Sequence, residues 1–197
     1  MRVRALSTLA LLSLAAVGVQ TASAGDPSTA GNKLQCFDGT QDGYSGSCSL
    51  DGRSATLTNP VGGYSGVYVA RTNLAGKRLA DVNQLAFSYA GATSGGSPRI
   101  TLPADIDGDG TWEDFISADA VTCNDGAGTV DVINDADCAI SFNGGSGAPA
   151  VGWAAFVAAN PGVRVATDAI PFVIADQAGT VTVSNVRIGR GPARAAK

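Results

Sequence analysis

The sequence contains no histidine and only one glutamate among its 197 residues. The absence of histidine excludes Ser-His-Asp and Cys-His catalytic mechanisms, and it excludes zinc and iron sites with histidine ligands. The sequence has no glycine-rich phosphate loop followed by lysine and serine or threonine, and no dinucleotide-binding fingerprint after a strand. Paired carboxylates, as in glycoside hydrolases, remain open, but the pair must be two aspartates or Glu113 with an aspartate.

Residues that favour helices or contacts with polyanions are also scarce. Lysine occurs three times, glutamate once and methionine only at position 1, whereas valine, isoleucine and threonine are common. This composition predicts an all-β fold. The formal net charge is −4, and it becomes −6 if a leader that contains Arg2 and Arg4 is removed. We therefore expect no nucleic-acid partner, because such partners require a basic surface.

The chain has only one long hydrophobic run, and it lies near the start. Residues 1–24 combine two arginines, an apolar run and small residues at the end, which is typical of a secretory signal peptide. The run is too short to span a bilayer comfortably, and no later segment is as long. We therefore predict a secreted protein without a membrane span in the mature chain. After the signal peptide we predict a flexible lead-in (25–33), a single β-sandwich domain (34–189) and a disordered basic tail (190–197).

Four cysteines in an exported chain predict two disulfides. Three pairings are possible, and we favour the local one, which joins Cys36 to Cys48 and Cys123 to Cys138. Each bridge then contributes about 3 kcal/mol by restricting the unfolded chain. A zinc site or catalytic thiols are the alternatives, but the spacings of 12 and 15 residues and the lack of histidine disfavour both.

Short apolar alternations separated by Gly, Asn, Asp and Pro predict about ten strands. The candidate strands are Ser54–Asn59, Ser65–Arg71, Gln84–Ala90, Arg99–Pro103, Glu113–Val121, Gly128–Ile133, Cys138–Phe142, Val163–Ala166, Ile170–Ala175 and Thr180–Ile188. Ile170, Phe172 and Ile174 share one face of their strand. A change of parity after Val183 predicts a β-bulge near Ser184–Asn185.

One helix is predicted over Ala150–Ala159, before the helix-ending sequence Asn-Pro-Gly. Trp153, Phe156 and Val157 have helical spacing, and we assign Trp153 and Phe156 to the core. About ten short strands, one short helix and two small disulfide loops together predict a two-sheet antiparallel β-sandwich of the jelly-roll type.

An Asp-rich segment, Asp105–Asp114, has the ligand spacing of a calcium-binding loop. Ca²⁺ prefers six to eight hard oxygen ligands, which a tight turn supplies from alternate residues. The predicted ligands are four carboxylates and one backbone carbonyl, in the order Asp105, Asp107, Asp109, Thr111 (carbonyl) and Glu113. Gly110 lies where the chain must turn sharply. Ile116 takes the place of the bidentate acid that ends an EF-hand loop, so the EF-hand itself is not predicted.

The charge around this loop favours a bound cation. Between Arg99 and Arg164 there is no lysine or arginine, whereas the span contains ten acidic residues. Clustered carboxylates without counter-charge destabilise the folded state, and a divalent cation removes that repulsion. A solvated polar turn is the alternative for the loop. For the acids within Asp125–Asp137 the sequence leaves open exposed turns, a second metal loop or the acid and base of a hydrolase.

Three segments resemble known proteins. The Asp105–Asp114 loop resembles the Asp-x-Asp/Asn-x-Asp-Gly-x-x-Asp/Glu loops of integrin-type propeller repeats, which implies a metal loop between two antiparallel strands. Thr180–Ile188 resembles the last strand of jelly-roll binding modules appended to bacterial extracellular enzymes. Ser94–Ile100 and Ala169–Ala175 are similar to secreted actinobacterial β-sandwich proteins, a likeness that implies no activity.

The aromatic side chains favour a binding module over an enzyme. Sugar-binding sandwiches use aromatic rings as apolar platforms flanked by polar groups. Four rings lie in or beside glycine-rich segments, where exposure is expected: Tyr44, Tyr64, Tyr68 and Trp112. We therefore predict a secreted, calcium-stabilised, non-catalytic module that binds extracellular polysaccharide. The alternatives are a structural or cell-surface interaction protein, in which the rings mediate packing, and an Asp-based glycoside hydrolase; for Tyr64 and Tyr68 a cross-strand packing role is the alternative.

Overall fold

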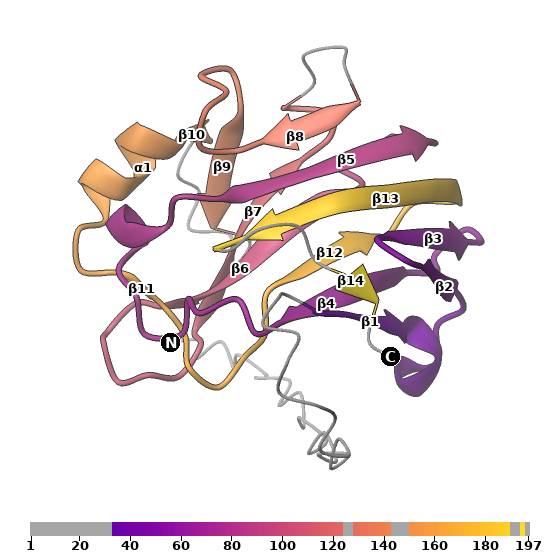
Figure 1. Cartoon of the computed structure of the whole chain (residues 1–197), viewed down its shortest axis with the longest axis horizontal. Coiled ribbons are helices and arrows are strands. Elements are labelled where there is room, and N and C mark those ends of the chain that lie inside the picture. Colours follow the sequence, from indigo (N-terminus) through magenta and orange to yellow (C-terminus); the bar gives the residue numbers. More distant parts are fainter. Residues whose placement is uncertain (1–32, 124–127, 143–149, 190–193, 196–197) are drawn as a thin grey trace, which may run out of the picture. The chain divides into compact units, whose positions relative to one another are not determined.

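Two β-sheets with the hydrophobic core between them make up the fold, as predicted (Figure 1). The computed structural model describes residues 33–123, 128–142, 150–189 and 194–195, and these described residues belong to one compact unit. The predicted signal peptide and residues 25–32 of the lead-in lie outside the described residues. Within the described part of the chain, no helix is long and apolar enough to cross a membrane.

The larger sheet carries nine strands in the order β10-β9-β7-β6-β12-β4-β1-β14, with β11 paired to β6. Their bounds are β1 (Lys33–Asp38), β4 (Ser65–Ala70), β6 (Arg99–Asp105), β7 (Asp114–Asp119), β9 (Ala139–Phe142), β10 (Val151–Gly152), β11 (Arg164–Val165), β12 (Phe172–Ala175) and β14 (Arg194–Ala195). All described pairs are antiparallel except β1 with β14.

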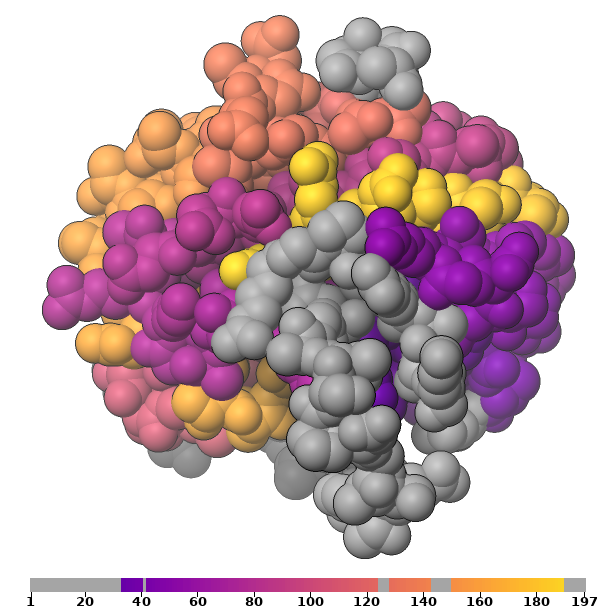
Figure 2. Space-filling model, in the orientation of Figure 1, coloured from indigo at the N-terminus to yellow at the C-terminus, as the bar shows by residue number. Residues whose placement is uncertain are grey.

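The smaller sheet has the order β2-β3-β13-β5-β8. Its strands are β2 (Ser47–Asp51), β3 (Ser54–Asn59), β5 (Leu85–Gly91), β8 (Thr129–Asp131) and β13 (Gly179–Ile188). In the space-filling view, β13 lies between β5 and β3 on the visible face (Figure 2). Three helices complete the described part of the fold: the 3-10 helices η1 (Gly39–Asp42) and η2 (Leu79–Asp81), and α1 (Trp153–Ala159).

Strand alternation supplies the core. In β4, Val67 and Val69 are fully buried, whereas Tyr68 between them is exposed on the other face. In β13, the register to β5 shifts between Ser184 and Arg187, with Asn185 at φ 49°, so the predicted bulge is confirmed. The bulge keeps the apolar residues on both sides of it in the core, because it restores the face lost by the change of parity.

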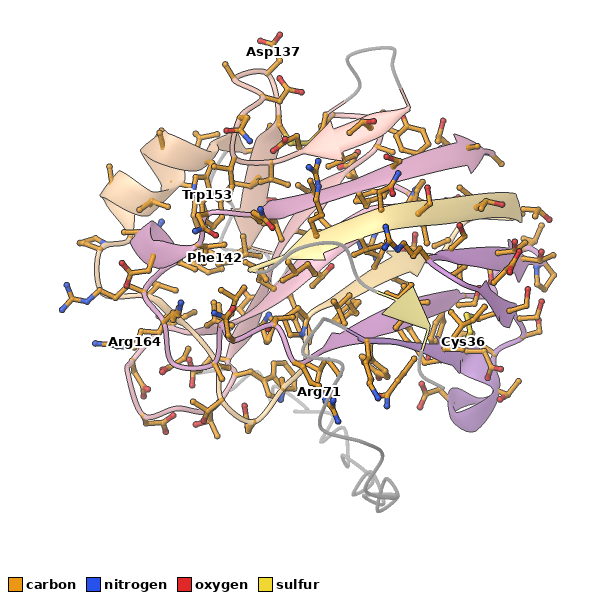
Figure 3. The ribbon with its side chains drawn as sticks, in the orientation of Figure 1. Cys36, Arg71, Asp137, Phe142, Trp153 and Arg164 are labelled. Atoms are coloured by element: carbon orange, nitrogen blue, oxygen red, sulfur yellow. A yellow bond between two sulfur atoms is a disulfide. The ribbon has the colours of Figure 1, made fainter. Side chains whose placement is uncertain are left out.

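The two disulfides have the favoured local pairing, Cys36–Cys48 and Cys123–Cys138. The first joins β1 of the larger sheet to β2 of the smaller one, so it ties the two layers together at the Cys36 edge (Figure 3). The second closes the segment that contains β8 and ends just before β9.

Three predictions differ from the structure. The strands β1 and β2 were not predicted, because Phe37 faces outward and the polar residues of β2 mask the apolar alternation. The helix begins at Trp153 rather than at Ala150, since Val151 and Gly152 pair with β9 as β10. Arg194–Ala195, assigned to a disordered tail, forms β14 beside β1, while the other tail residues lie outside the described part.

Candidate metal loop and aromatic face

The β6–β7 hairpin positions the Asp-rich loop. Asp105 is the last residue of β6 and Asp114 the first of β7, and Ala104 pairs with Asp114 across the hairpin. The hairpin joins two antiparallel strands. Asp105 is buried at 1% exposure, whereas the other loop carboxylates are exposed.

The loop brings four predicted metal ligands together. Carboxylate oxygens of Asp105, Asp107, Asp109 and Glu113 all lie within 4.8 Å of one another, so the group could hold a metal ion. Among the residues that the structure describes, it is the one acidic group gathered in this way. Thr111 lies between Asp109 and Glu113, and coordination by its carbonyl remains a prediction.

Backbone N–H groups hold the carboxylates in place. The two oxygens of Asp105 accept hydrogen bonds from the N–H groups of Gly108 (2.7 Å) and Gly110 (3.2 Å). Both glycines have left-handed backbones, with φ 87° and φ 96°, which side chains with a Cβ rarely adopt. From the far end of the loop, Glu113 accepts a hydrogen bond from the N–H of Ile106 at 2.5 Å, so the loop is closed on itself.

Asp109 is stabilised in its charged form. It accepts hydrogen bonds from the Thr111 hydroxyl and from the Thr111 N–H at 2.7 Å, and these two bonds lower the pKa of its carboxyl group. A carboxylate that stays ionised retains the lone pairs that a cation requires.

A second segment, Thr167–Asp168 after β11, buttresses the loop. Thr167 donates to the carbonyl of Gly110 from both its N–H (2.9 Å) and its hydroxyl (2.8 Å). Asp168 accepts a hydrogen bond from the N–H of Trp112 at 3.0 Å. Asp168 was not predicted from the sequence, because it lies 56 residues from Trp112 along the chain. The only local signal was a Thr-Asp pair between two predicted strands.

The fold places an arginine close to the acidic loop. Arg164 of β11 lies directly opposite Asp105 of β6, although no lysine or arginine precedes it in sequence back to Arg99. Its guanidinium donates to the Gly76 carbonyl at 2.9 Å, whereas Arg99 forms an ion pair with Asp176. The folded chain therefore places a cation opposite Asp105, at the point where β6 enters the loop.

The second acidic group satisfies its own turns. Asp125 lies outside the described residues. Asp131 accepts hydrogen bonds from the Asn134 N–H (3.3 Å) and side-chain amide (3.0 Å), and Asp135 accepts from the Asp137 N–H at 2.9 Å. These contacts fit the exposed turns that the sequence left open, since each carboxylate caps the backbone beside it.

Five aromatic rings form a continuous row on the outer face of the larger sheet, and we call them the aromatic row: Trp112, Phe115, Phe172, Tyr68 and Phe37. Trp112 of the metal loop stacks on Phe115 of β7, with centroids 4.8 Å apart and planes at 19°. Phe172 of β12 then makes edge contacts with Phe115 (5.4 Å), Phe37 (5.8 Å) and Tyr68 (6.2 Å).

The row covers the sheet beneath it. Thr101 of β6 faces outward and pairs with Phe172, yet it is only 1% exposed. Gly66 of β4 lies directly under the ring of Phe37, and a Cβ atom at Gly66 would clash with that ring. Trp112 and Tyr68, both predicted ligand-binding residues, remain 38% and 37% exposed. Phe37, Phe115 and Phe172 were missed as site residues, because apolar residues in strands are ordinarily assigned to the core.

Tyr44 and Tyr64, also predicted for ligand binding, form a separate pair beside η1, with ring centroids 5.6 Å apart. The Tyr64 hydroxyl donates to the Asp42 carboxylate. Partial burial, followed by this hydrogen bond, raises the pKa of Tyr64 to about 12. Tyr64 directly precedes β4, whose Ser65 pairs with Asp38 next to Phe37, so the pair lies at the Phe37 end of the row. Burial and then the Asp42 charge also raise the pKa of Tyr68.

No family model, curated protein or solved structure matches this chain. Its function is therefore inferred from the geometry of the metal loop and the aromatic row. Both features meet at Trp112, which belongs to the loop by sequence and to the row by contact.

Proposed function

We propose that the protein is a secreted, calcium-stabilised, non-catalytic module that binds carbohydrate through the aromatic row. The observation that carries this proposal is the stacking of Trp112 on Phe115. The loop that gathers four carboxylates thereby also fixes one end of the row. An ion in the loop restrains Trp112, and a restrained ring loses less conformational entropy when a ligand binds.

Calcium is the ion that this loop suits best. The ligand set consists only of oxygen atoms, and four carboxylates within 4.8 Å supply enough charge for a divalent cation. Magnesium usually keeps several of its waters and binds through one or two carboxylates, whereas calcium accepts a flexible cage of protein oxygens. The two disulfides support export, because such bonds persist in oxidising compartments.

Carbohydrate is the ligand class that the row suits. The apolar C–H faces of sugar rings stack on aromatic faces, and polar groups at the margin fix the orientation. At the Phe37 end, exposed Gln35 and the Tyr64–Asp42 pair provide such groups.

A structural or surface-interaction protein is the second candidate. Ile106 and Ile170, 45% and 43% exposed, lie in segments that adjoin the row, and aliphatic side chains of this kind are more useful in protein contacts than in sugar binding. Under this alternative the row packs against another protein, and calcium only stiffens the fold.

Retention on insoluble polysaccharides, with calcium or with a chelator, tests the proposal. We expect the purified protein to be retained in calcium, and Trp112→Ala to reduce retention about tenfold or more, as for other exposed aromatic anchors. Val121→Ala, which trims another exposed apolar side chain, is the matched control and should bind normally. If no polysaccharide retains the protein in calcium, the carbohydrate function is refuted and the interaction protein is favoured.

A further inference from the structure

A cavity of about 230 Å³ lies against the Thr167 segment that is hydrogen-bonded to the metal loop. Its walls are the end of β4 with the turn that follows (69–73 and 75) and the end of β11 with the segment that leads to β12 (165–167 and 169–171). Tyr68 and Phe172 are cross-strand neighbours, and along the chain they immediately precede and follow these two wall segments. Thr167, in the second wall, is hydrogen-bonded to Gly110 of the loop.

Arg71 stands in this wall in an unusual conformation. Its φ is 66°, and Asn73 in the same turn has φ 57°. Asparagine adopts this left-handed region readily, whereas arginine does so rarely. Such conformations cost free energy and concentrate at binding sites, where the surrounding structure imposes them. The Arg71 side chain is exposed, so the turn presents its guanidinium to solvent beside the cavity.

Arg71 lines the cavity, and further basic residues lie in the segments that continue its walls, beside Asp168. Four of the nine lysine and arginine residues that the structure describes lie in its walls or in their direct continuations: Arg71, Lys77, Arg78 and Arg164. The continuations are joined, because Arg78 bridges to Arg164 and Val165 N–H donates to the Lys77 carbonyl at 2.8 Å. Within the described side chains, Arg71 has no carboxylate partner.

We propose that this cavity is a subsite for the carboxylate of an acidic sugar, so that the ligand of the module is a polysaccharide with uronic acid units. This inference rests on the carbohydrate function proposed above. Arg71 lies three residues after Tyr68 along the chain, and its planar fork binds carboxylates through two hydrogen bonds. On this proposal a polysaccharide that stacks on Tyr68 and Phe172 reaches Arg71 with an acidic unit. A phosphate polymer without sugar rings would make no use of the aromatic row. Calcium in the adjoining loop offsets its carboxylates, so the anionic ligand meets less repulsion.

Soluble oligogalacturonates and their fully methyl-esterified counterparts separate the charge from the sugar ring. The test is the affinity of the purified full-length protein for the acid form and for the ester form, measured by titration calorimetry in excess calcium. The wild type should bind the acid form about tenfold more tightly than the ester, which is the scale of one hydrogen-bonded charge pair. Arg71→Gln should remove this preference and leave ester binding unchanged.

Two further variants keep the test independent of folding. Arg71→Gly lacks the guanidinium but adopts a left-handed backbone without strain, so it should fold at least as well and still lose the preference. Arg53→Gln removes an exposed arginine in the β2–β3 turn, outside the cavity walls, and should bind both probes as the wild type does.

The outcomes distinguish this subsite from the wider function. Equal wild-type affinity for acid and ester, or an unchanged preference in Arg71→Gln, refutes the subsite, while ester binding that depends on Trp112 still supports the carbohydrate function. Competition by inorganic polyphosphate as effective as by oligogalacturonate shows a general anion site and also refutes it. If neither probe binds and no polysaccharide retains the protein, both proposals fail together.

Discussion

The outer faces of the two sheets differ in chemistry although both belong to one sandwich. On the smaller sheet, hydroxyl side chains meet across strands, with Thr58 and Thr180 joined at 3.0 Å and Thr56 and Thr182 at 3.4 Å. On the larger sheet, the corresponding outer positions carry the aromatic row. Threonine pairs satisfy a solvated β-surface without any apolar cover.

The smaller sheet has a solvent-facing surface without an aromatic row, so a sandwich of this kind does not need one for its stability. The inner faces of both sheets already supply the buried core, including Val67 and Val69 from β4 and Val181 and Val183 from β13. Exposed rings on one face cost solubility and are expected where a surface binds something. The difference between the faces therefore supports the binding function proposed from the stacking of Trp112 on Phe115.

The largest expected effect comes from Phe172, the ring that contacts three others in the row. Phe172→Leu keeps most of the apolar volume but removes the aromatic ring, so it should weaken polysaccharide binding about 30-fold, as for a central binding residue. Stability should fall by less than about 1.5 kcal/mol. Thr182→Ala, on the opposite face, should leave binding unchanged. If Phe172→Leu and Thr182→Ala bind polysaccharide with similar affinity, the two outer faces do not differ in binding.

A comparison of the two acidic groups should give an intermediate effect. With about 1 mM calcium and a dissociation constant of about 0.1 mM, binding adds about 1.4 kcal/mol of stability. Asp107→Ala should therefore lower the melting temperature in calcium by about 4 °C and leave it unchanged in a chelator. Asp135→Ala removes a carboxylate that only caps a turn, so its melting temperature should differ from that of the wild type by the same amount in both buffers. Equal losses in both buffers for Asp107→Ala would contradict metal binding.

The sequence was sufficient for features that depend on local patterns. The spacing of Asp105, Asp107 and Asp109 around glycines specifies a loop that turns on itself, and the local disulfide pairing follows from short separations. The bulge near Asn185 was readable because the parity of buried valines changes there. Each of these depends on neighbouring residues, whose relative positions the backbone geometry constrains.

Features that depend on the order of strands in the sheets could not be predicted from the sequence. The row brings Phe37, Phe172 and Phe115 together from β1, β12 and β7, and no local pattern states that these strands share a sheet. Phe172 and Ile174 do share a face, but it is the outer one, because Val173 and Ala175 occupy the core. Pairing between β6 and β11 likewise places Arg164 opposite Asp105. In the linear sequence, Arg164 lies at the far end of a span that contains acidic residues but no lysine or arginine.

The smallest expected effect concerns the Tyr64 end of the larger face. The pKa of Tyr64 is raised to about 12, chiefly by burial and then by the hydrogen bond to Asp42. An unfolded tyrosine ionises near pH 10, so the neutral form of Tyr64 stabilises the fold fully below pH 10 and this contribution is lost as the pH rises through about 12. Asp42→Asn should lower the pKa of Tyr64 but leave it above 10, because burial remains. Ultraviolet titration of the phenolate, compared with Tyr64→Phe to assign the step, measures the shift; an unchanged pKa in Asp42→Asn would show that Asp42 does not hold this end of the row.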